Sequence, residues 1–192
     1  MAFYVGLTGK NCAGKDSVAD ILAAKGFERL SLSDAIRDEL RRRGAEITRE
    51  ALITAGNELR ARFGASILAD RIKGLLTSDR AVIVSIRNPE EIASLRELRG
   101  FVLVGVDAPA PTRYARAVAR HREGGEQSYE DFLAKEQREN TRDPCAQQLD
   151  ACLAQADYLI TNTGSLAELQ AAVERFLDKY EGRAQGGEDE NP

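Results

Sequence analysis

The chain reads Phe3-Tyr4-Val5-Gly6-Leu7 and, one residue later, Gly9-Lys10-Asn11-Cys12-Ala13-Gly14-Lys15-Asp16-Ser17. An apolar run that enters a glycine-bearing turn with a lysine indicates a strand followed by a phosphate-binding loop. The glycines let backbone N–H groups turn toward phosphate oxygens, and Lys15 adds a full positive charge. The helix expected over residues 17–25 directs the positive end of its dipole at the same anion. The stretch therefore predicts a nucleotide-phosphate site at the first strand–helix turn.

This loop departs from the usual pattern at one position. The lysine is usually followed by Ser or Thr, whose hydroxyl holds Mg²⁺, but here Asp16 takes that place and the hydroxyl follows on Ser17. A carboxylate next to a triphosphate is electrostatically sensible if a cation lies between them, so Asp16 and Ser17 are the predicted Mg²⁺ contacts. The alternative is that Asp16 only stabilises the first helical turn through the helix dipole.

Composition favours one α/β domain that acts on a small molecule. The 192 residues are enough for a single core, no run approaches the roughly 18 apolar residues that cross a bilayer, and no basic leader precedes the first strand. The three cysteines form no C-x-x-C pair and there is one histidine, which indicates reduced thiols and no zinc cluster. A net charge of −4 argues against a nucleic-acid surface. We expect a cytoplasmic protein with a small-molecule partner, no nucleic acid and no membrane.

Apolar runs alternate with amphipathic helical patterns along the whole chain. This alternation is typical of a doubly wound parallel sheet with helices on both faces, which predicts an α/β fold with three layers. Five strands are expected, at residues 3–7, 27–32, 81–86, 101–106 and 158–160. Asn88-Pro89-Glu90-Glu91 predicts a helix start with a capping box directly after the third strand.

Two long helical stretches are inserted between these strands. Residues 34–76 hold three helical patterns, at 34–43, 48–63 and 65–76, more than a single crossover needs, and such an insertion is expected to bind the acceptor. Residues 111–155, interrupted by Gly124-Gly125, are expected to form a mobile lid. We predict a single domain over residues 1–181 and a disordered tail over the polar, acidic residues 182–192.

The chain resembles the nucleoside monophosphate kinase group of P-loop kinases over nearly its whole length. Ser31-Leu32-Ser33-Asp34-Ala35-Ile36-Arg37 and Val84-Ser85-Ile86-Arg87-Asn88 look like the segments that offer arginines to the acceptor phosphate in adenylate-kinase-like enzymes. Residues 107–120 and 156–164 look like the lid arginines and the adenine-side loop of dephospho-CoA kinase and its relatives. Residues 14–17 and 56–64 look most similar to deoxynucleoside monophosphate kinases and to dephospho-CoA-kinase-like proteins. One position departs, because adenylate-kinase-like enzymes place an acid where this chain has Val84 and Ser85.

The resemblance implies a P-loop fold of the nucleotide-kinase type, with ATP and Mg²⁺ as cofactors. The implied reaction transfers phosphate to a nucleoside or deoxynucleoside monophosphate, a step of deoxynucleotide metabolism, and such transfer depends on positioning and on cations around the migrating group. Arg37 and Arg87 are expected to clamp the acceptor phosphate, and Arg116 and Arg120, four residues apart on one helix face, to close over the γ-phosphate. The predicted residues are Lys15, Arg116 and Arg120 for catalysis; Gly9, Asn11, Cys12, Ala13, Gly14, Lys15, Asp16, Ser17, Asn162 and Gly164 for ATP; Asp34, Arg37, Arg60 and Arg87 for the acceptor; and Asp16 and Ser17 for the metal.

Other interpretations stay open. Arg113 and Arg122 compete for the lid role, Asp34 could simply cap its helix, and His121 fits an exposed helix position. Dephospho-CoA kinase is an alternative activity; its acceptor is a ribose hydroxyl, so a general base is expected, which Asp34 could supply. A nucleotide-sensing module without turnover, similar to the kinase-like half joined to some deoxycytidylate deaminases, is an alternative of another class, which the departures at Asp16 and Val84 keep open. The sequence determines neither the acceptor's base and sugar nor the oligomeric state.

Overall fold

A computed structural model of the chain describes residues 2–120, 128–141 and 143–185. Its sheet has five strands, all parallel, in the order β2-β3-β1-β4-β5. The strands are β1 (Phe3–Thr8), β2 (Glu28–Ser31), β3 (Arg80–Val84), β4 (Phe101–Asp107) and β5 (Tyr158–Thr161). Because the chain runs from β1 first toward β2 and later toward β4, the carboxyl end of β1 lies at the switch point where open α/β sheets bind ligands.

All five strands predicted from the sequence are confirmed, with differences of one or two residues at several strand ends. β3 ends at Val84 rather than at residue 86, because Ser85 has a positive φ of 67° that interrupts the extended backbone. Ile86 stays buried next to β1, where its carbonyl accepts a hydrogen bond from Thr8 Oγ1 at 3.1 Å. β2 ends at Ser31 because the next residue, Leu32, already begins a helix.

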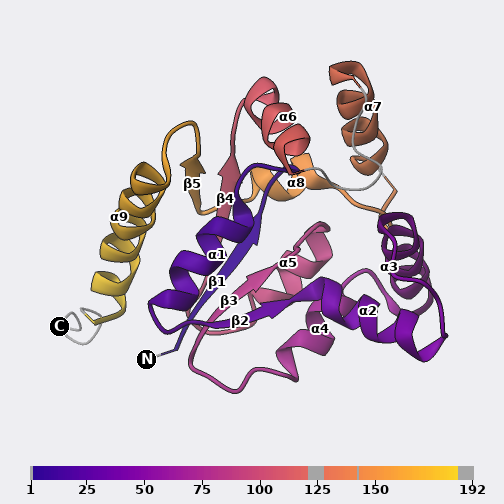
Figure 1. Cartoon of the computed structure of the whole chain (residues 1–192). Helices are drawn as coiled ribbons and strands as arrows, with labels where there is room; N and C mark the ends of the chain where they lie inside the picture. The colour runs from indigo at the N-terminus through magenta and orange to yellow at the C-terminus, as the bar shows by residue number, and fades with distance from the viewer. Residues whose placement is uncertain (1, 121–127, 142, 186–192) are drawn as a thin grey trace.

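Helices cover both faces of the sheet (Figure 1). One face packs against α1 (Lys15–Ala24) and α9 (Leu166–Gln185), and the other against α2 (Leu32–Arg42), α4 (Ile67–Lys73), α5 (Pro89–Leu95) and α8 (Leu149–Ala154). Alternate residues of β3 serve the two cores, since Val82 and Val84 face α1 and α9 whereas Ile83 faces the opposite layer. The predicted three-layer α/β fold is therefore confirmed.

Among the described residues, each of the two insertions contains three helices. The first contains α2, α3 (Arg49–Phe63) and α4, in agreement with the three predicted helical patterns. The second contains α6 (Ala110–Ala119), α7 (Tyr129–Glu139) and α8, and α7 lies beside α3, to which the pair Arg49–Glu139 joins it (Figure 1). Helix α6 packs on α7 through Tyr114 and Phe132.

The C-terminal helix α9 continues to Gln185, four residues into the segment expected to be a disordered tail, and residues 186–192 lie outside the described residues. His121 and Arg122 also lie outside them. No helix in the described part of the chain has the length and apolar character that a membrane span requires.

Candidate functional site

The predicted phosphate loop, residues 9–14, joins β1 to the first turn of α1 at the switch point of the sheet. Two of its positions require glycine. Gly9 has a φ of 134°, and a Cβ there would lie 2.0 Å from the carbonyl oxygen of Val106 on β4. Gly14, at the N-cap of α1, has a φ of 106°. Gly9 thus allows the loop to pack closely on β4, and Gly14 allows the sharp turn into α1. The N-terminus of α1 lies at the end of the loop, where it would favour an anion.

Lys15 folds back over this loop. Its Nζ donates hydrogen bonds to the carbonyls of Gly9 and Lys10, both at 2.7 Å. Burial of the amine, followed by the positive charge of Arg87, lowers the pKa of Lys15 from 10.5 to about 7, although Asp16 and Cys12 act in the opposite direction. The positive charge of Arg87 thus acts on the loop lysine, and both residues follow adjacent strands, β1 and β3.

Two predicted residues hold the loop from the side of the second insertion. Arg116 on α6 reaches the carbonyls of Cys12 and Ala13 at 3.4 Å each, and its Nη2 donates to the carbonyl of Asn162 at 3.0 Å. Asn162, directly after β5, donates from Nδ2 to the carbonyl of Ala13 at 2.8 Å. Arg116 and Asn162 thus lie against the phosphate loop, where a guanidinium could also reach a bound phosphate.

Two other predicted residues, Arg120 and Gly164, form no hydrogen bond or ion pair with the phosphate loop in the described part of the chain. Arg120 is exposed at the C-terminal end of α6. Gly164 lies before α9, next to the carboxylate of Glu168.

Arg113, which competed with Arg116 for the lid role, has a scaffold role. It is 3% exposed, forms an ion pair with Glu136 of α7, and donates from Nε to the carbonyl of Ala108 at 2.8 Å and from Nη1 to that of Asn11 at 3.4 Å. These contacts join α6, α7 and the phosphate loop into one unit. The apolar contacts of Cys12 with Ala117 and Phe132 strengthen the same junction.

Asp16 lies on the outer side of α1. Its Oδ1 accepts a hydrogen bond from Arg29 of β2 at 3.1 Å, and the same arginine also pairs with Asp20. This geometry matches the alternative in which Asp16 is a helix-start residue better than the predicted metal contact. Among the described residues, no group of three or more His, Cys, Asp or Glu side chains is placed to hold a metal ion. Ser17, one turn into α1, is the loop hydroxyl left for Mg²⁺.

Arg87 follows β3 and meets α7 and the segment before α8. Its Nη1 donates to Gln147 Oε1 at 2.8 Å and lies 4.0 Å from Glu139 Oε2. Arg49, at the start of α3, pairs with Glu139 Oε1 at 2.5 Å. Its guanidinium also lies against the side-chain amide of Asn11 in the phosphate loop, and with that amide turned so that its oxygen faces Arg49, the oxygen accepts hydrogen bonds at 2.6 and 3.1 Å. The carboxylate of Glu139, whose side chain is 9% exposed, thus lies between Arg49 and Arg87, beside the phosphate loop.

Sequence reasoning missed Arg49 and Glu139. The only signal was the position of Arg49 as the first residue of a helix in the acceptor insertion. Nothing local in the sequence indicates that this helix start meets the phosphate loop.

Arg60 lies in a buried ion pair rather than in the expected contact with an acceptor. It is 3% exposed, and Nε and Nη2 donate to Glu91 Oε1 at 3.0 and 2.8 Å. The second oxygen of Glu91 accepts the backbone N–H groups of Arg87 and Asn88 at 2.8 and 3.1 Å. Arg60 therefore positions the backbone from which Arg87 extends.

Asp34 and Arg37 form part of a polar row at the carboxyl ends of β2 and β3. Arg37 Nη1 donates to Ser33 Oγ at 2.6 Å and to Asp34 Oδ1 at 3.0 Å. The hydroxyl of Ser31 lies 2.8 Å from that of Ser33 and 3.1 Å from that of Ser85. Hydroxyls and a guanidinium at this edge of the sheet match the expected position of acceptor-binding groups.

A cavity of about 270 Å³ opens next to Arg87, between α3 and the C-terminal end of α7. Two of its lining residues, Glu139 and Gln147, are the contact partners of Arg87. The lining residues are Ile53, Asn57, Arg138, Glu139, Thr141, Asp143, Ala146 and Gln147. Apolar and amide groups in one small space next to cations suit a molecule that carries both a ring and an anionic group.

Comparison with known proteins identifies the family. No protein-family model matches the chain. A UPF0200 protein of Hyperthermus butylicus is 32% identical over 174 residues, which cover 89% of this chain and 91% of that protein. The chain belongs to the UPF0200 family. Another UPF0200 protein, TK1334 of Thermococcus kodakarensis, is 28% identical over 181 residues that cover 90% of this chain and 95% of that protein. The family designation states no activity.

Solved structures with the same fold include kinases. TT1252 of Thermus thermophilus superposes with a TM-score of 0.60 at 23% identity, covering 93% of this chain and 97% of that one. Shikimate kinase of Bacteroides thetaiotaomicron gives 0.58 at 13% identity, covering 94% and 99%, and a gluconokinase of Sinorhizobium meliloti gives 0.53 at 17% identity, covering 95% and 98%. The protein therefore has a P-loop kinase fold, which confirms the broad part of the resemblance; the finer assignment to nucleoside monophosphate kinases is a matter of function.

Proposed function

We propose that this protein transfers the γ-phosphoryl group of ATP to a nucleoside or deoxynucleoside monophosphate and releases the diphosphate. One observation carries the proposal. Lys15 follows β1 and Arg87 follows β3, so both extend from the carboxyl ends of two adjacent parallel strands, and the charge of Arg87 helps lower the pKa of Lys15. Two cations that face one space from the donor side and the acceptor side are what transfer between two polyanions requires.

The donor side is formed by the phosphate loop and its neighbours. Backbone N–H groups of residues 9–14, the N-terminus of α1 and Lys15 would hold the β- and γ-phosphates. Arg116 already lies on the loop carbonyls and could turn one guanidinium face to the γ-phosphate. Mg²⁺ would neutralise charge on the phosphate oxygens, with the hydroxyl of Ser17 as the protein contact that this loop offers.

The acceptor side is formed by Arg87, Arg49 and the cavity beside them. The carboxylate of Glu139 lies between the two arginines, which supports an affinity of this cluster for anionic oxygens. An acceptor phosphate in that space would have its nucleoside in the cavity of about 270 Å³. Arg37, on the polar row at the end of β2, would approach the same phosphate from α2. Because the acceptor phosphate is already ionised at neutral pH, this reaction needs no protein base.

The test is ADP formation from Mg·ATP with each ribo- and deoxyribonucleoside monophosphate and with dephospho-CoA. We expect turnover with at least one monophosphate, and its loss in Lys15→Ala but not in Lys10→Ala, a change of the loop's other lysine, whose side chain pairs with Asp150. Turnover with dephospho-CoA alone would instead support the alternative kinase, for which Asp34, with 58% of its side chain exposed, is the available base. ATP binding without any turnover would support the sensor.

Substitution of Arg87 should affect the KM values of the two substrates differently. Arg87→Gln is expected to raise the KM for the acceptor far more than that for ATP, since a lost contact between buried charges costs on the order of 2–5 kcal/mol. Steady-state kinetics with each substrate varied in turn measure this split. Equal increases in both constants would show that Arg87 does not belong to the acceptor side.

A further inference from the structure

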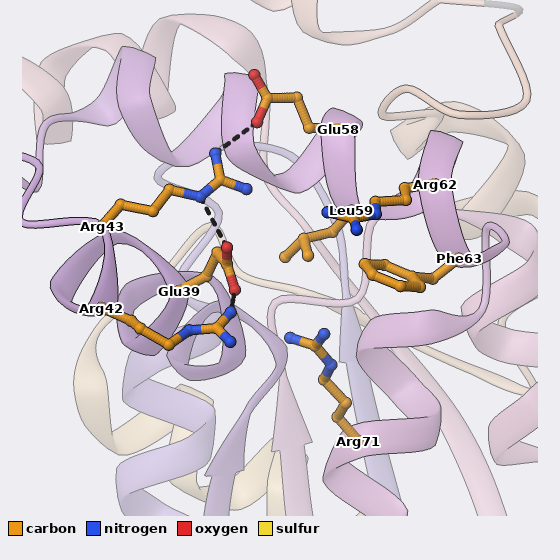
Figure 2. A pocket seen from close by; sticks show the side chains of 8 residues that line it. All are labelled: Glu39, Arg42, Arg43, Glu58, Leu59, Arg62, Phe63 and Arg71. Atoms are coloured by element: carbon orange, nitrogen blue, oxygen red, sulfur yellow. Dashed lines mark hydrogen bonds and ion pairs between the residues drawn. The ribbon is translucent and has the colours of Figure 1, made fainter.

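A second cavity lies between the C-terminal ends of α2 and α3 and the middle of α4 (Figure 2). Its volume is about 420 Å³, within the range of small-molecule sites. We call it the arginine pocket. Its lining residues are Glu39, Arg42 and Arg43 of α2, Glu58, Leu59, Arg62 and Phe63 of α3, and Arg71 of α4.

The arginine pocket is separate from the phosphate loop. Helix α3 meets the loop at its first residue, through Arg49 and Asn11, whereas Arg62 and Phe63 are its last two residues. At a rise of 1.5 Å per residue, the two ends of α3 are about 20 Å apart. A ligand in this pocket would therefore lie away from the ATP space. The acceptor cavity is nearer, since its lining residue Asn57 precedes Glu58 in α3, but the two cavities share no lining residue.

The pocket has more positive than negative groups. Glu39 is engaged by both Arg42 and Arg43, and Glu58 by Arg43 (Figure 2). Both carboxylates that line the pocket, those of Glu39 and Glu58, are therefore already in ion pairs.

Arg62 and Arg71 have no carboxylate partner among the described residues. Their guanidinium carbons lie 4.9 and 5.8 Å from the centre of the Phe63 ring. Figure 2 shows the guanidinium of Arg71 directed into the space between Glu39 and Phe63. Two such cations on one wall favour an anion, and the planar fork of arginine suits a phosphate oxygen pair.

The same wall presents an aromatic surface. Phe63 is 50% exposed, so part of its ring stays open to solvent beside the two guanidinium groups. This open part of the ring could stack on a planar ring of a ligand. We propose that the arginine pocket binds a phosphate monoester carried by a planar ring compound, such as a nucleoside monophosphate, as a ligand additional to the substrates. The phosphate pairs with Arg62 and Arg71, and the ring stacks on Phe63.

Fluorescence can report occupancy of this pocket directly. The chain contains no tryptophan, so Phe63→Trp gives a single indole on the pocket wall. The probes are a nucleoside monophosphate, ribose 5-phosphate and inorganic phosphate. We expect a saturable change in emission with all three and the tightest binding for the nucleoside monophosphate, because only it offers a planar ring. Adding Arg71→Gln should weaken its binding by about tenfold or more, the loss typical of a charge-assisted hydrogen bond.

Two matched variants separate the pocket from the rest of the molecule. Arg41→Gln removes an arginine of α2 that pairs with Asp38 outside the pocket, and it should leave the titration unchanged. Lys15→Ala should also leave it unchanged, since the phosphate loop lies at the other end of α3. The proposal is overturned if emission does not saturate, if Arg71→Gln binds as tightly as the parent, if ribose 5-phosphate binds as tightly as the nucleoside monophosphate, or if Lys15→Ala abolishes the signal. Direct titration calorimetry of the unsubstituted chain and of Arg71→Gln with the same nucleotide excludes an effect of the indole itself.

Discussion

Lys15 is the residue on which the proposed chemistry depends most. It lies among loop carbonyls, no carboxylate of the described residues forms a hydrogen bond with it, and burial together with Arg87 lowers its pKa to about 7. Between this value and the ordinary 10.5, the folded protein binds fewer protons at Lys15 than the unfolded chain. The contribution of Lys15 to the free energy of unfolding therefore rises as pH increases from about 7 to 10.5.

A bound phosphate should reverse this shift, because an anion stabilises the charged amine. We predict that nucleotide binding at a pH of about 8.5, where phosphates are already ionised and free Lys15 is mostly neutral, takes up close to one proton. Calorimetric titration of ADP in two buffers of different ionisation enthalpy measures this uptake. Tight binding with no proton uptake would contradict the placement of Lys15 on the phosphates, and Lys15→Ala should lose both uptake and affinity.

Substitutions of Asp16 and Ser17 distinguish the two interpretations of the altered loop, in which Asp16 either contacts Mg²⁺ or only stabilises the start of α1. The pairing of Asp16 with Arg29 leads us to predict that Asp16→Ala keeps its dependence of turnover on Mg²⁺ concentration, as does Asp20→Ala, which removes the other acid on that arginine. Ser17→Ala should raise the Mg²⁺ concentration needed for half-maximal rate, since it removes the loop hydroxyl. If Asp16→Ala loses most of its turnover while Asp20→Ala does not, the metal contact predicted from the electrostatics of the loop is correct.

At the scale of helices and strands, the pair Arg60–Glu91 joins α3 to the junction of β3 and α5. Removal of one partner of a buried pair leaves an uncompensated charge, so Arg60→Met should lower the free energy of unfolding by about 3–5 kcal/mol. Adding Glu91→Gln to this variant should recover part of the loss. Chemical denaturation measures both, and Arg62→Met, two residues further on an exposed face, is the control, with an expected change within about 0.5 kcal/mol.

The opposite result is equally informative about Arg60. Sequence reasoning placed this residue on the acceptor. Unchanged stability together with a raised acceptor KM in Arg60→Met would support that placement and contradict the structural role.

The strands and the phosphate loop were predictable from the sequence, whereas the contacts of the arginines were not. Buried parallel strands are continuous apolar runs, and the glycines and lysine after β1 constrain the backbone locally, so both were found. The partner of an arginine depends on which elements the fold brings together. Arg60 pairs with Glu91 of α5 and Arg113 pairs with Glu136 of α7, which are 31 and 23 residues away in the sequence. No local sequence pattern indicates such pairs. Arg49 was missed for the same reason.

At the scale of the whole molecule, the strand order brings the donor and acceptor groups together. β1 lies between β3 and β4, so the phosphate loop after β1 faces Arg87 after β3 on one side and the residues that follow β4 and β5 on the other. The two insertions meet through Arg49–Glu139, and Lys10–Asp150 joins the phosphate loop to the second insertion. This arrangement followed from the predicted fold class, whereas the contact between the insertions did not, because it joins helices from two different crossovers.

If the γ-phosphate of ATP moves to a nucleoside monophosphate at the phosphate loop, its fate can be followed with a label. ATP labelled on the γ-phosphate is incubated with Mg²⁺, the protein and the acceptor that supports the fastest ADP formation, and the products are separated. We predict that the label appears in the nucleoside diphosphate with the unsubstituted chain and remains in ATP with Lys15→Ala. Label that stays in ATP with the unsubstituted chain, or passes only to inorganic phosphate or to dephospho-CoA, would contradict the account.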